Sequence, residues 1–278
     1  DEPTAALTDA EIDELFKIIM DLRSKGIGII YISHRMDEIK VITDRVTVMR
    51  DGEYVGTLIS EDCTKEDIIN MMVGRVIYEE PKQQSNVPKD AEVVLEVKNL
   101  NAGRMVQNVS FRLHRGEILG FAGLMGAGRT ETARAIFGAD RVDSGEIYIN
   151  GRMVNIKSPE DAVTYGIGYL SEDRKRYGLI LDKSVAVNTT LASLLHFLKN
   201  RLIDTKRENE AAEKYVNRLN TKTPGVGVPV GNLSGGNQQK VVVGKWLVRD
   251  CDVLIFDEPT RGIDVGAKSE IYHLMNEL

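Results

Sequence analysis

The sequence has few cysteines, no long apolar run and no excess of positive charge, and each shortage excludes a class of protein. Its two cysteines, Cys63 and Cys251, have no second Cys or His at metal-ligand spacing, which indicates reduced thiols rather than a disulfide framework or a zinc site. The longest apolar stretches, such as Gly26–Ile32, are far shorter than the roughly 20 residues that span a bilayer. A net charge of −6 argues against a nucleic-acid partner, because non-specific nucleic-acid binding depends on basic surface.

A tetrapeptide repeat indicates that a larger protein carries two copies of one domain. Asp-Glu-Pro-Thr occurs at Asp1–Thr4 and again 256 positions later at Asp257–Thr260, and an apolar stripe at helical spacing recurs at the same offset. We therefore expect these 278 residues to be a window that opens inside a motif of the first copy and closes before the second copy is complete. The stripe comprises Leu15, Ile18, Ile19 and Leu22 in the first copy and Ile271, Leu274, Met275 and Leu278 in the second.

Composition and periodicity divide the chain into three parts. Residues 1–75 are expected to be the end of the first copy, 92–278 most of the second, and the polar, proline-containing stretch 76–91 a linker. We also expect Gly26–His34 to join the second copy's sheet beside Val253–Phe256, because the second copy's own equivalent lies outside the window. The patterns of the first copy predict a helix over Asp9–Leu22, a buried strand over Gly26–Ser33, a strand over Arg45–Met49 and a helix over Lys65–Val73.

The second copy begins with strand patterns and continues with helix signals. Glu117–Ala122 is predicted to be a strand that leads into a glycine-rich loop. A capping box at Thr205–Glu208 predicts the start of a charged helix that runs to about Leu219. The other predicted elements are strands over Val93–Val97, Val109–Leu113 and Val253–Phe256, a hairpin from Ser144–Ile149 through Asn150-Gly151, a helix capped by Ser158 before Pro159, and a helix over Val241–Val248.

The glycine-rich loop Gly123-Leu-Met-Gly-Ala-Gly-Arg-Thr130 has the spacing of a phosphate-binding loop. Its glycines let backbone N–H groups converge on phosphate oxygens at a helix N-terminus, and Thr130 has the hydroxyl that Mg²⁺ takes. A dinucleotide-binding turn fits less well, since its third glycine would fall at Glu131. Arg129 stands where the standard motif has Lys. Its planar guanidinium is wider than an ammonium, so the sequence leaves open how the β- and γ-phosphates would be bound.

Two further segments carry polar groups at the ends of apolar elements. Val253–Phe256 is a buried-strand pattern followed by Asp257 and Glu258, a pair that is suited to holding Mg²⁺ and polarising an attacking water. Leu233-Ser-Gly-Gly-Asn-Gln-Gln239, which we call the signature segment, places a hydroxyl and two glycine amides at a helix start, where they can receive a phosphate. Taken alone, the acidic pair could also be an ordinary strand end without function, and the signature segment could be an ordinary glycine-rich helix cap.

In this order, the glycine loop, the signature segment and the acidic strand end resemble the nucleotide-binding domain of ABC transporters. The resemblance implies an α/β fold: a P-loop core, an antiparallel β subdomain and a helical subdomain near Val187–Asn232. It also implies ATP and Mg²⁺ as cofactors, with each ATP held between two domains. Contacts to ATP would come from Gly123, Leu124, Met125, Gly126, Ala127, Gly128, Arg129, Thr130 and Glu131, and from Ser234, Gly235, Gly236 and Gln238.

The same resemblance assigns catalytic and metal-binding roles. Glu258, and Glu2 in the first copy, match the catalytic glutamate, and His34 matches the switch histidine that contacts the γ-phosphate. Thr130, Asp257 and Glu172 would bind the metal, although a glutamate at position 172 departs from the family's glutamine. Two more departures are Thr8 in place of the aspartate seen at Asp264, and the absence of an aromatic residue for adenine in 101–107.

Glu172-Asp-Arg-Lys175, together with the motifs above, is similar to one subfamily, the fused two-domain ATPases of bacterial monosaccharide importers of the ribose and galactose type. This implies ATP hydrolysis that drives import through membrane permease subunits, served by a periplasmic or extracellular sugar-binding protein, at the cytoplasmic face of the membrane. The chain alone is expected to be inactive, because the signature segment opposite its glycine loop lies outside the window. Three alternatives stay open: a soluble ABC ATPase of DNA repair or translation, an ATP sensor without turnover, and an importer of nucleosides or another sugar-like solute.

Overall fold

The computed structural model describes residues 3–4, 7–33, 35–50, 52–73, 87–88, 90–124, 126–263 and 265–278. These form two compact units, one of residues 1–81 with 264–270 and the other of 82–263 with 271–278. Most of the predicted linker lies outside the described residues, as do the predicted site residues Glu2, His34 and Met125. The domain boundaries set from the sequence stay a prediction.

The first unit contains the helices predicted over Asp9–Leu22 and Lys65–Val73 and the strand predicted over Arg45–Met49, together with a helix and a second strand that were not predicted. Glu11 accepts hydrogen bonds from both the backbone N–H and the hydroxyl of Thr8 at the start of the first helix. A small apolar core joins the hairpin to two of the helices and includes Met36, Val48 and Ile68. The elements are α1 (Asp9–Ser24), α2 (Met36–Ile42), β1 (Arg45–Arg50), β2 (Glu53–Ile59) and α3 (Lys65–Val73), with β1 antiparallel to β2.

The predicted strand over Gly26–Ser33 does not form, and this expectation was wrong. The described residues here have no strand pairing, and Ile30 is 92% exposed. In the described part of the chain β10 (Val253–Phe256) pairs with β7 (Ile167–Leu170) alone, so the predicted addition to that sheet was wrong too. The physical reason is that a strand needs a neighbour for its N–H and C=O groups, however apolar its sequence.

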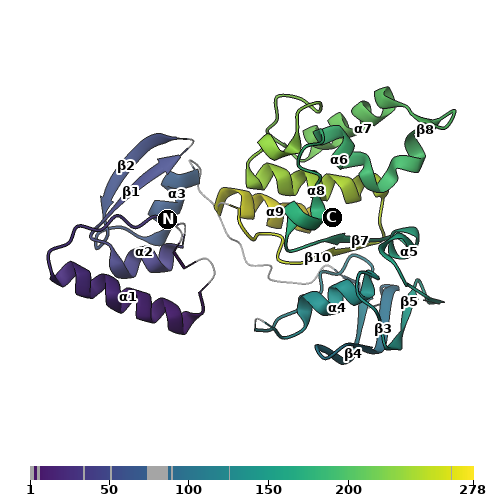
Figure 1. The fold of residues 1–278 in the computed structure, drawn as a ribbon, viewed down its shortest axis with the longest axis horizontal. Coiled ribbons are helices and arrows are strands. Elements are labelled where there is room, and N and C mark those ends of the chain that lie inside the picture. Colours follow the sequence, from purple (N-terminus) through teal and green to yellow (C-terminus); the bar gives the residue numbers. More distant parts are fainter. Residues whose placement is uncertain are drawn as a thin grey trace. The chain divides into compact units, whose positions relative to one another are not determined.

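The second unit has an antiparallel sheet with the order β4-β3-β5-β6. Figure 1 shows this sheet together with α4 (Arg129–Ile136). The predicted strand over Glu117–Ala122 is absent: these residues have no strand pairing, and Phe121 is 47% exposed. The sheet comprises β3 (Val93–Ala102), β4 (Val106–His114), β5 (Ser144–Ile149) and β6 (Arg152–Val154).

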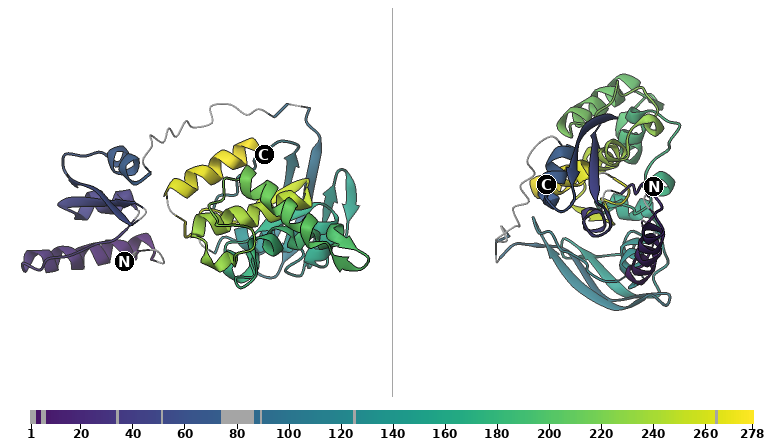
Figure 2. Two further views of the ribbon diagram at one scale, coloured as in Figure 1. Left: turned by 90° about the horizontal axis from the view of Figure 1, so that it is seen from above. Right: turned by 90° about the vertical axis from the view of Figure 1, so that its left-hand side faces the viewer.

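A parallel pair of strands forms the centre of the second unit. Strand β10 runs parallel to β7, with Ile255 opposite Tyr169. Within this unit, the pair lies between the helices α6 to α8 and the antiparallel sheet (Figures 1 and 2). The ring of Phe137 contacts Tyr169 in a tilted arrangement and Trp246 edge to face, which fastens the end of α4 to β7 and α8. Two more helices are α5 (Pro159–Thr164), capped by Ser158 as predicted, and α9 (Val265–Glu277), of which the part from Ile271 belongs to this unit.

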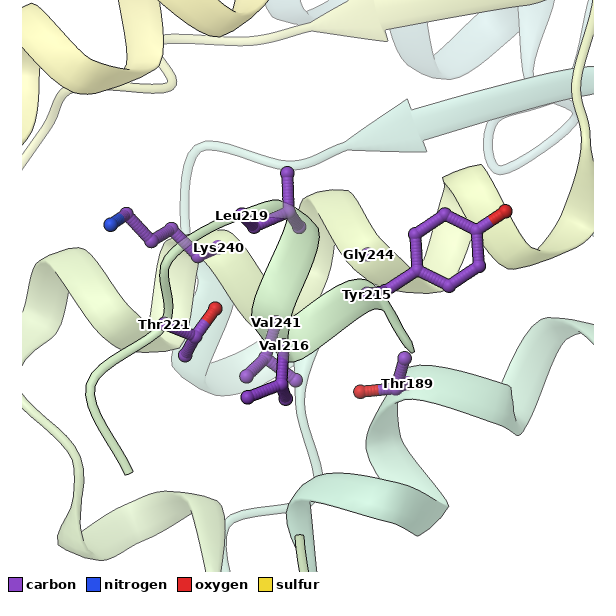
Figure 3. A pocket seen from close by; sticks show the side chains of 8 residues that line it. All are labelled: Thr189, Tyr215, Val216, Leu219, Thr221, Lys240, Val241 and Gly244. Carbon is purple, nitrogen blue, oxygen red and sulfur yellow. The ribbon is translucent and has the colours of Figure 1, made fainter. Parts of the chain in front are cut away.

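Helices and one short strand pair make up the remainder of the second unit, and the helices agree with the predicted helical subdomain. The N-cap of α7 is Asp204 rather than Thr205, because the carboxylate of Asp204 accepts from Arg207 N–H at 3.2 Å. Close packing at Gly244 brings α6 and α7 against α8 (Figure 3), and a Cβ there would lie 3.4 Å from Leu219. The elements are η1 (Arg174–Gly178, a π-helix), α6 (Val185–Thr190), η2 (Leu191–Phe197), β8 (Leu198–Lys199), β9 (Leu202–Ile203), α7 (Thr205–Arg218), η3 (Val230–Asn232) and α8 (Gly235–Arg249).

Lys245 on α8 gives the stability of this unit a specific pH dependence. Its ammonium is buried and donates to Gly178 O at 2.9 Å, and burial lowers the pKa of Lys245 from 10.5 to about 8. Between these two values the unfolded chain holds a proton that the folded chain has released, so the free energy of unfolding rises with pH. We expect Lys245→Met to remove a rise of about 3 kcal/mol across this window.

The measurement is denaturant unfolding of the variant and the wild type from pH 7 to pH 11. The difference between the two free energies isolates Lys245 from other groups that titrate there, such as Cys251, whose pKa burial raises to about 11. The control is Lys206→Met on the exposed face of α7. Parallel pH profiles for Lys245→Met and the wild type would contradict the prediction.

Candidate active site

The glycine loop leads directly into α4. Gly128 is the N-cap of this helix, with a φ of 86°, and a Cβ added there would lie 2.4 Å from Met105 O. Only glycine fits this left-handed turn against a neighbouring backbone. The unpaired N–H groups of the first turn of α4, with Thr130 among its first residues, therefore form a site of positive potential.

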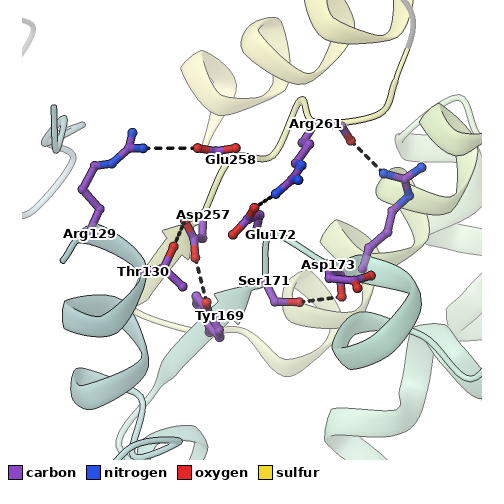
Figure 4. A network of polar contacts seen from close by, with 10 residues as sticks. Arg129, Thr130, Tyr169, Ser171, Glu172, Asp173, Asp257, Glu258 and Arg261 are labelled. Carbon is purple, nitrogen blue, oxygen red and sulfur yellow. Dashed lines mark hydrogen bonds and ion pairs between the residues drawn. The ribbon is translucent and has the colours of Figure 1, made fainter. Parts of the chain in front are cut away.

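Asp257 is placed by the parallel strand pair. Its backbone N–H donates to Leu170 O at 2.9 Å, which extends the pairing of β10 with β7 by one residue. Its buried carboxylate accepts from Thr130 Oγ1 at 3.1 Å and from Tyr169 Oη at 2.9 Å (Figure 4). Burial, with the charge of Asp257, raises the pKa of Tyr169 well above its usual value, so Tyr169 stays a hydrogen-bond donor.

Glu258 follows in a strained conformation. Its φ of 44° lies in the left-handed region, which costs a non-glycine residue about 1 to 2 kcal/mol. The next chain segment is held by Arg261 N–H, which donates to Glu258 O at 3.0 Å. The carboxylate turns to the start of α4, where Arg129 Nη2 lies 3.3 Å away (Figure 4). Strain of this kind is typical of functional residues.

The donor set of this cluster fits magnesium together with a phosphate. Mg²⁺ in proteins usually takes one or two side-chain oxygens and completes its shell with water and substrate phosphates. Thr130 and Asp257 supply a hydroxyl and a carboxylate side by side, next to the helix N-terminus. In the described ranges no group of three or more His, Cys, Asp or Glu residues is placed to hold a metal by protein ligands alone.

A second cluster lies at the end of β7. The side chains of Glu172 and Arg261 form an ion pair, and Ser171 Oγ donates to Asp173 O at 3.2 Å (Figure 4). Glu172 is thus bound to the loop that follows Glu258 rather than to Asp257. Its predicted role as a metal ligand stays a prediction.

Comparison with known proteins identifies the family that has this arrangement. A sequence model described as ABC transporter matches residues 106–261, more than half of the chain. The chain belongs to the ABC transporter family. No helix in the described part of this ABC chain is long and apolar enough to cross a membrane.

Relatives of the chain are described as import proteins. A putative ribose/galactose/methyl galactoside import ATP-binding protein from Burkholderia cenocepacia is 59% identical over 279 residues, covering 100% of this chain and 54% of the relative. A ribose import ATP-binding protein from Clostridium tetani is 50% identical, covering 100% of this chain and 55% of the relative. The chain therefore spans about half the length of the curated relatives it matches.

Solved structures confirm the predicted fold class. An ATP-binding cassette of an ABC transporter in its ADP conformation has a TM-score of 0.56 and 20% identity, over 66% of this chain and 76% of that one. A cassette dimer in a post-hydrolysis state, bound to ADP and Pi, has a TM-score of 0.54 and 21% identity, over 65% of this chain and 81% of that one. At these identities the likeness establishes the α/β P-loop fold of the ABC type and no more.

The structure brings together only some of the residues that the ABC motifs predict. Arg129, Thr130, Asp257 and Glu258 form one cluster. In the signature segment, Ser234 is exposed and accepts from the amide of Asn237 at 2.9 Å. The amide of Gln238 points into the protein and donates to Leu233 O at 3.1 Å. Its predicted contact with nucleotide stays a prediction, as does that of Glu131.

Two residues of this region were missed by sequence reasoning. Tyr169 contacts Asp257, and Arg174 joins the signature helix to the loop after Glu258. The one sequence signal for Tyr169 was its place in the short apolar run 167–170 directly before Ser171, a run that was not predicted to be a strand. Arg174 gave no signal beyond its membership of the Glu-Asp-Arg-Lys run, because a surface turn has the same composition.

Proposed function

We propose that the protein containing this chain binds and hydrolyses ATP with Mg²⁺. The observation that carries the proposal is the contact of Thr130 with Asp257 at the N-terminus of α4, beside Glu258 and Arg129. A hydroxyl, a buried carboxylate and a helix N-terminus are the groups that hold a magnesium–nucleotide complex. Family membership and the names of the relatives support the same function.

Each residue has a role in this proposal. The N–H groups of Gly126–Thr130 bind phosphate oxygens, and Asp257, oriented by Tyr169, binds the metal with Thr130. Mg²⁺, when bound, neutralises charge on the phosphates. Glu258 accepts a proton from the attacking water once Arg129 has moved from its carboxylate to a phosphate.

The ion pair of Arg129 with Glu258 favours a second candidate, an ATP sensor without turnover. Phosphate release by the intact protein, measured with and without Mg²⁺, separates the two. Steady release that needs Mg²⁺ supports hydrolysis. Tight ATP binding with no release of phosphate supports the sensor and refutes the first proposal.

We further propose that hydrolysis drives import of a monosaccharide through membrane permease subunits. The support is the naming of relatives at 50–59% identity as ribose or ribose/galactose/methyl galactoside import ATP-binding proteins. A sugar-binding protein would deliver the solute, and this subunit would lie at the cytoplasmic face of the membrane. Uptake of labelled ribose, galactose and a nucleoside by cells with and without the intact protein tests the solute class.

An open cavity in the second unit offers a docking place for the permease. It has a volume of about 550 Å³ and lies where η2 approaches α5 and α8. Leu195 on its rim is 81% exposed, and Tyr177 is 56% exposed. Apolar side chains around a hollow are typical of protein contact sites. The lining combines charged residues, such as Arg134, Glu160 and Arg249, with aromatic and aliphatic ones, among them Phe137, Tyr169, Leu191, Leu194 and Trp246.

Leu195→Glu is therefore expected to weaken permease binding by roughly thirtyfold, because a carboxylate would be buried in an apolar contact. ATP binding should not change, since Leu195 is not part of the Asp257 cluster. Capture of detergent-solubilised permease by the intact protein measures the effect. The control is Leu202→Glu on β9, where the side chain is 74% exposed and does not line the cavity. Equal losses from both variants would refute this docking site.

A further inference from the structure

Arg174 is a buried cation whose hydrogen-bond partners, in the part of the chain that the structure describes, are neutral groups. It is 9% exposed, and burial lowers the pKa of its guanidinium. Its Nε lies 3.5 Å from Gln238 Oε1, Nη1 donates to Arg261 O at 2.8 Å, and Nη2 donates to Gly262 O at 3.1 Å. The charge of the neighbouring Asp173 offsets only part of the effect of burial on this pKa, and a buried cation that forms no ion pair is unfavourable for folding, which points to a role other than stability.

The guanidinium connects three segments that are distant in the sequence. Arg174 is the first residue of η1, directly after Glu172 and Asp173. Its side chain reaches both the first turns of α8 and the loop 258–262. A planar fork with five N–H groups can hold acceptors in several directions, which an ammonium on a flexible stem cannot do as rigidly. The side-chain ion pair of Glu172 with Arg261 ties the same two loops together at the surface.

Close packing shows that the contact with α8 is tight. A Cβ added to Gly235 would lie 2.6 Å from Arg174 Nη2 and 2.9 Å from Gly262 O. The signature glycine, the guanidinium and the loop after Glu258 therefore meet with no room for another atom. A displacement of the loop cannot leave the helix start unaffected.

We infer that Arg174 is a positioning residue, which holds the first turn of α8 and the loop carrying Glu258 in one fixed geometry. The inference rests on the proposed ATP hydrolysis. In that proposal Glu258 acts on the ATP of its own glycine loop, whereas the resemblance to ABC domains implies that Gly235 would contact the ATP held by the opposite domain. Arg174 thus links the geometry of the two ATP sites. Small displacements of catalytic groups are known to lower rates by as much as about a hundredfold.

The test is Arg174→Ala in the intact protein, with Lys175→Ala as the matched control. Lys175 is the exposed neighbour, so both variants lose one positive charge from the same helix. Arg174→Ala should lower kcat at least tenfold and change the KM for ATP less than threefold. Guanidinium at millimolar concentration should restore kcat by filling the vacated site, and methylammonium should restore less. The control should keep kcat within twofold of the wild type.

Hydrogen exchange supplies a readout that does not depend on turnover. Amides of 234–238 and 258–262 should exchange faster in Arg174→Ala than in Lys175→Ala, and Arg174→Lys should lie between them because it keeps donors for the two carbonyls. Unchanged exchange in either segment, or a kcat within twofold of the wild type, overturns the inference. If the wild-type protein releases no phosphate, the proposed function fails, and exchange alone then decides the role of Arg174.

Discussion

Glu2→Gln in the intact two-domain protein is expected to remove most of its ATP turnover, about a hundredfold, whereas Glu258→Gln leaves more than half. In the proposed mechanism each glutamate would serve one of two composite sites. The site of Glu2 has His34 and, from the second copy, the signature segment, and each of these members is of the residue type that the family motifs expect. The site of Glu258 has Arg129 in place of lysine, and in this structure Arg129 is paired with Glu258 itself.

The expected difference in turnover between the two sites follows from the guanidinium of Arg129. It is wider than an ammonium, and it must leave Glu258 before both groups can act on the phosphate and the water. A deficit of about 3 kcal/mol in transition-state stabilisation would slow this site by roughly a hundredfold. Phosphate release by the two single variants measures this difference in rate between the two sites, with the exposed Glu213→Gln as the control. Equal losses of turnover from Glu2→Gln and Glu258→Gln would contradict the prediction that the two sites hydrolyse ATP at different rates.

Asp257→Asn is expected to abolish the contribution of Mg²⁺ to ATP binding at the glycine loop of this chain, a loss of at least about tenfold in affinity. The substitution keeps the shape of the side chain, and the amide oxygen can still accept from Thr130 or Tyr169. Only the negative charge that Mg²⁺ requires is removed. Binding without Mg²⁺ should be unchanged or slightly tighter, because a carboxylate near the phosphates repels them.

Titration of ATP into this chain, with Mg²⁺ or with a chelator, measures both quantities. Tyr169→Phe is the matched control, since it removes one hydrogen bond from Asp257 and leaves the charge. We expect Tyr169→Phe to lower the affinity for Mg²⁺-ATP by less than about tenfold, in keeping with the 0.5–1.5 kcal/mol of an ordinary hydrogen bond. An unchanged dependence on Mg²⁺ in Asp257→Asn would remove Asp257 from the metal site.

The sequence by itself determined the local elements and the chemical groups of the site. Helices α1 and α3 and strand β1 form where local patterns predict them, because these patterns act between residues close in the chain. The order of the glycine loop, signature segment and acidic strand end was sufficient to predict the ABC family. Residue type at each motif position also predicted that Thr130 and Asp257 would meet.

Only the tertiary structure decided which apolar segments become strands and which side chains serve the motifs. Residues 27–33 and 117–122 have strand-like sequences, yet neither pairs with a neighbour, because ladder hydrogen bonds depend on partners distant in the chain. Tyr169 orients Asp257 because β7 pairs with β10, and Arg174 is buried because three separate segments close around it. Long-range contacts of this kind leave no periodic trace in a sequence, whereas capping residues and turns are specified by their immediate neighbours.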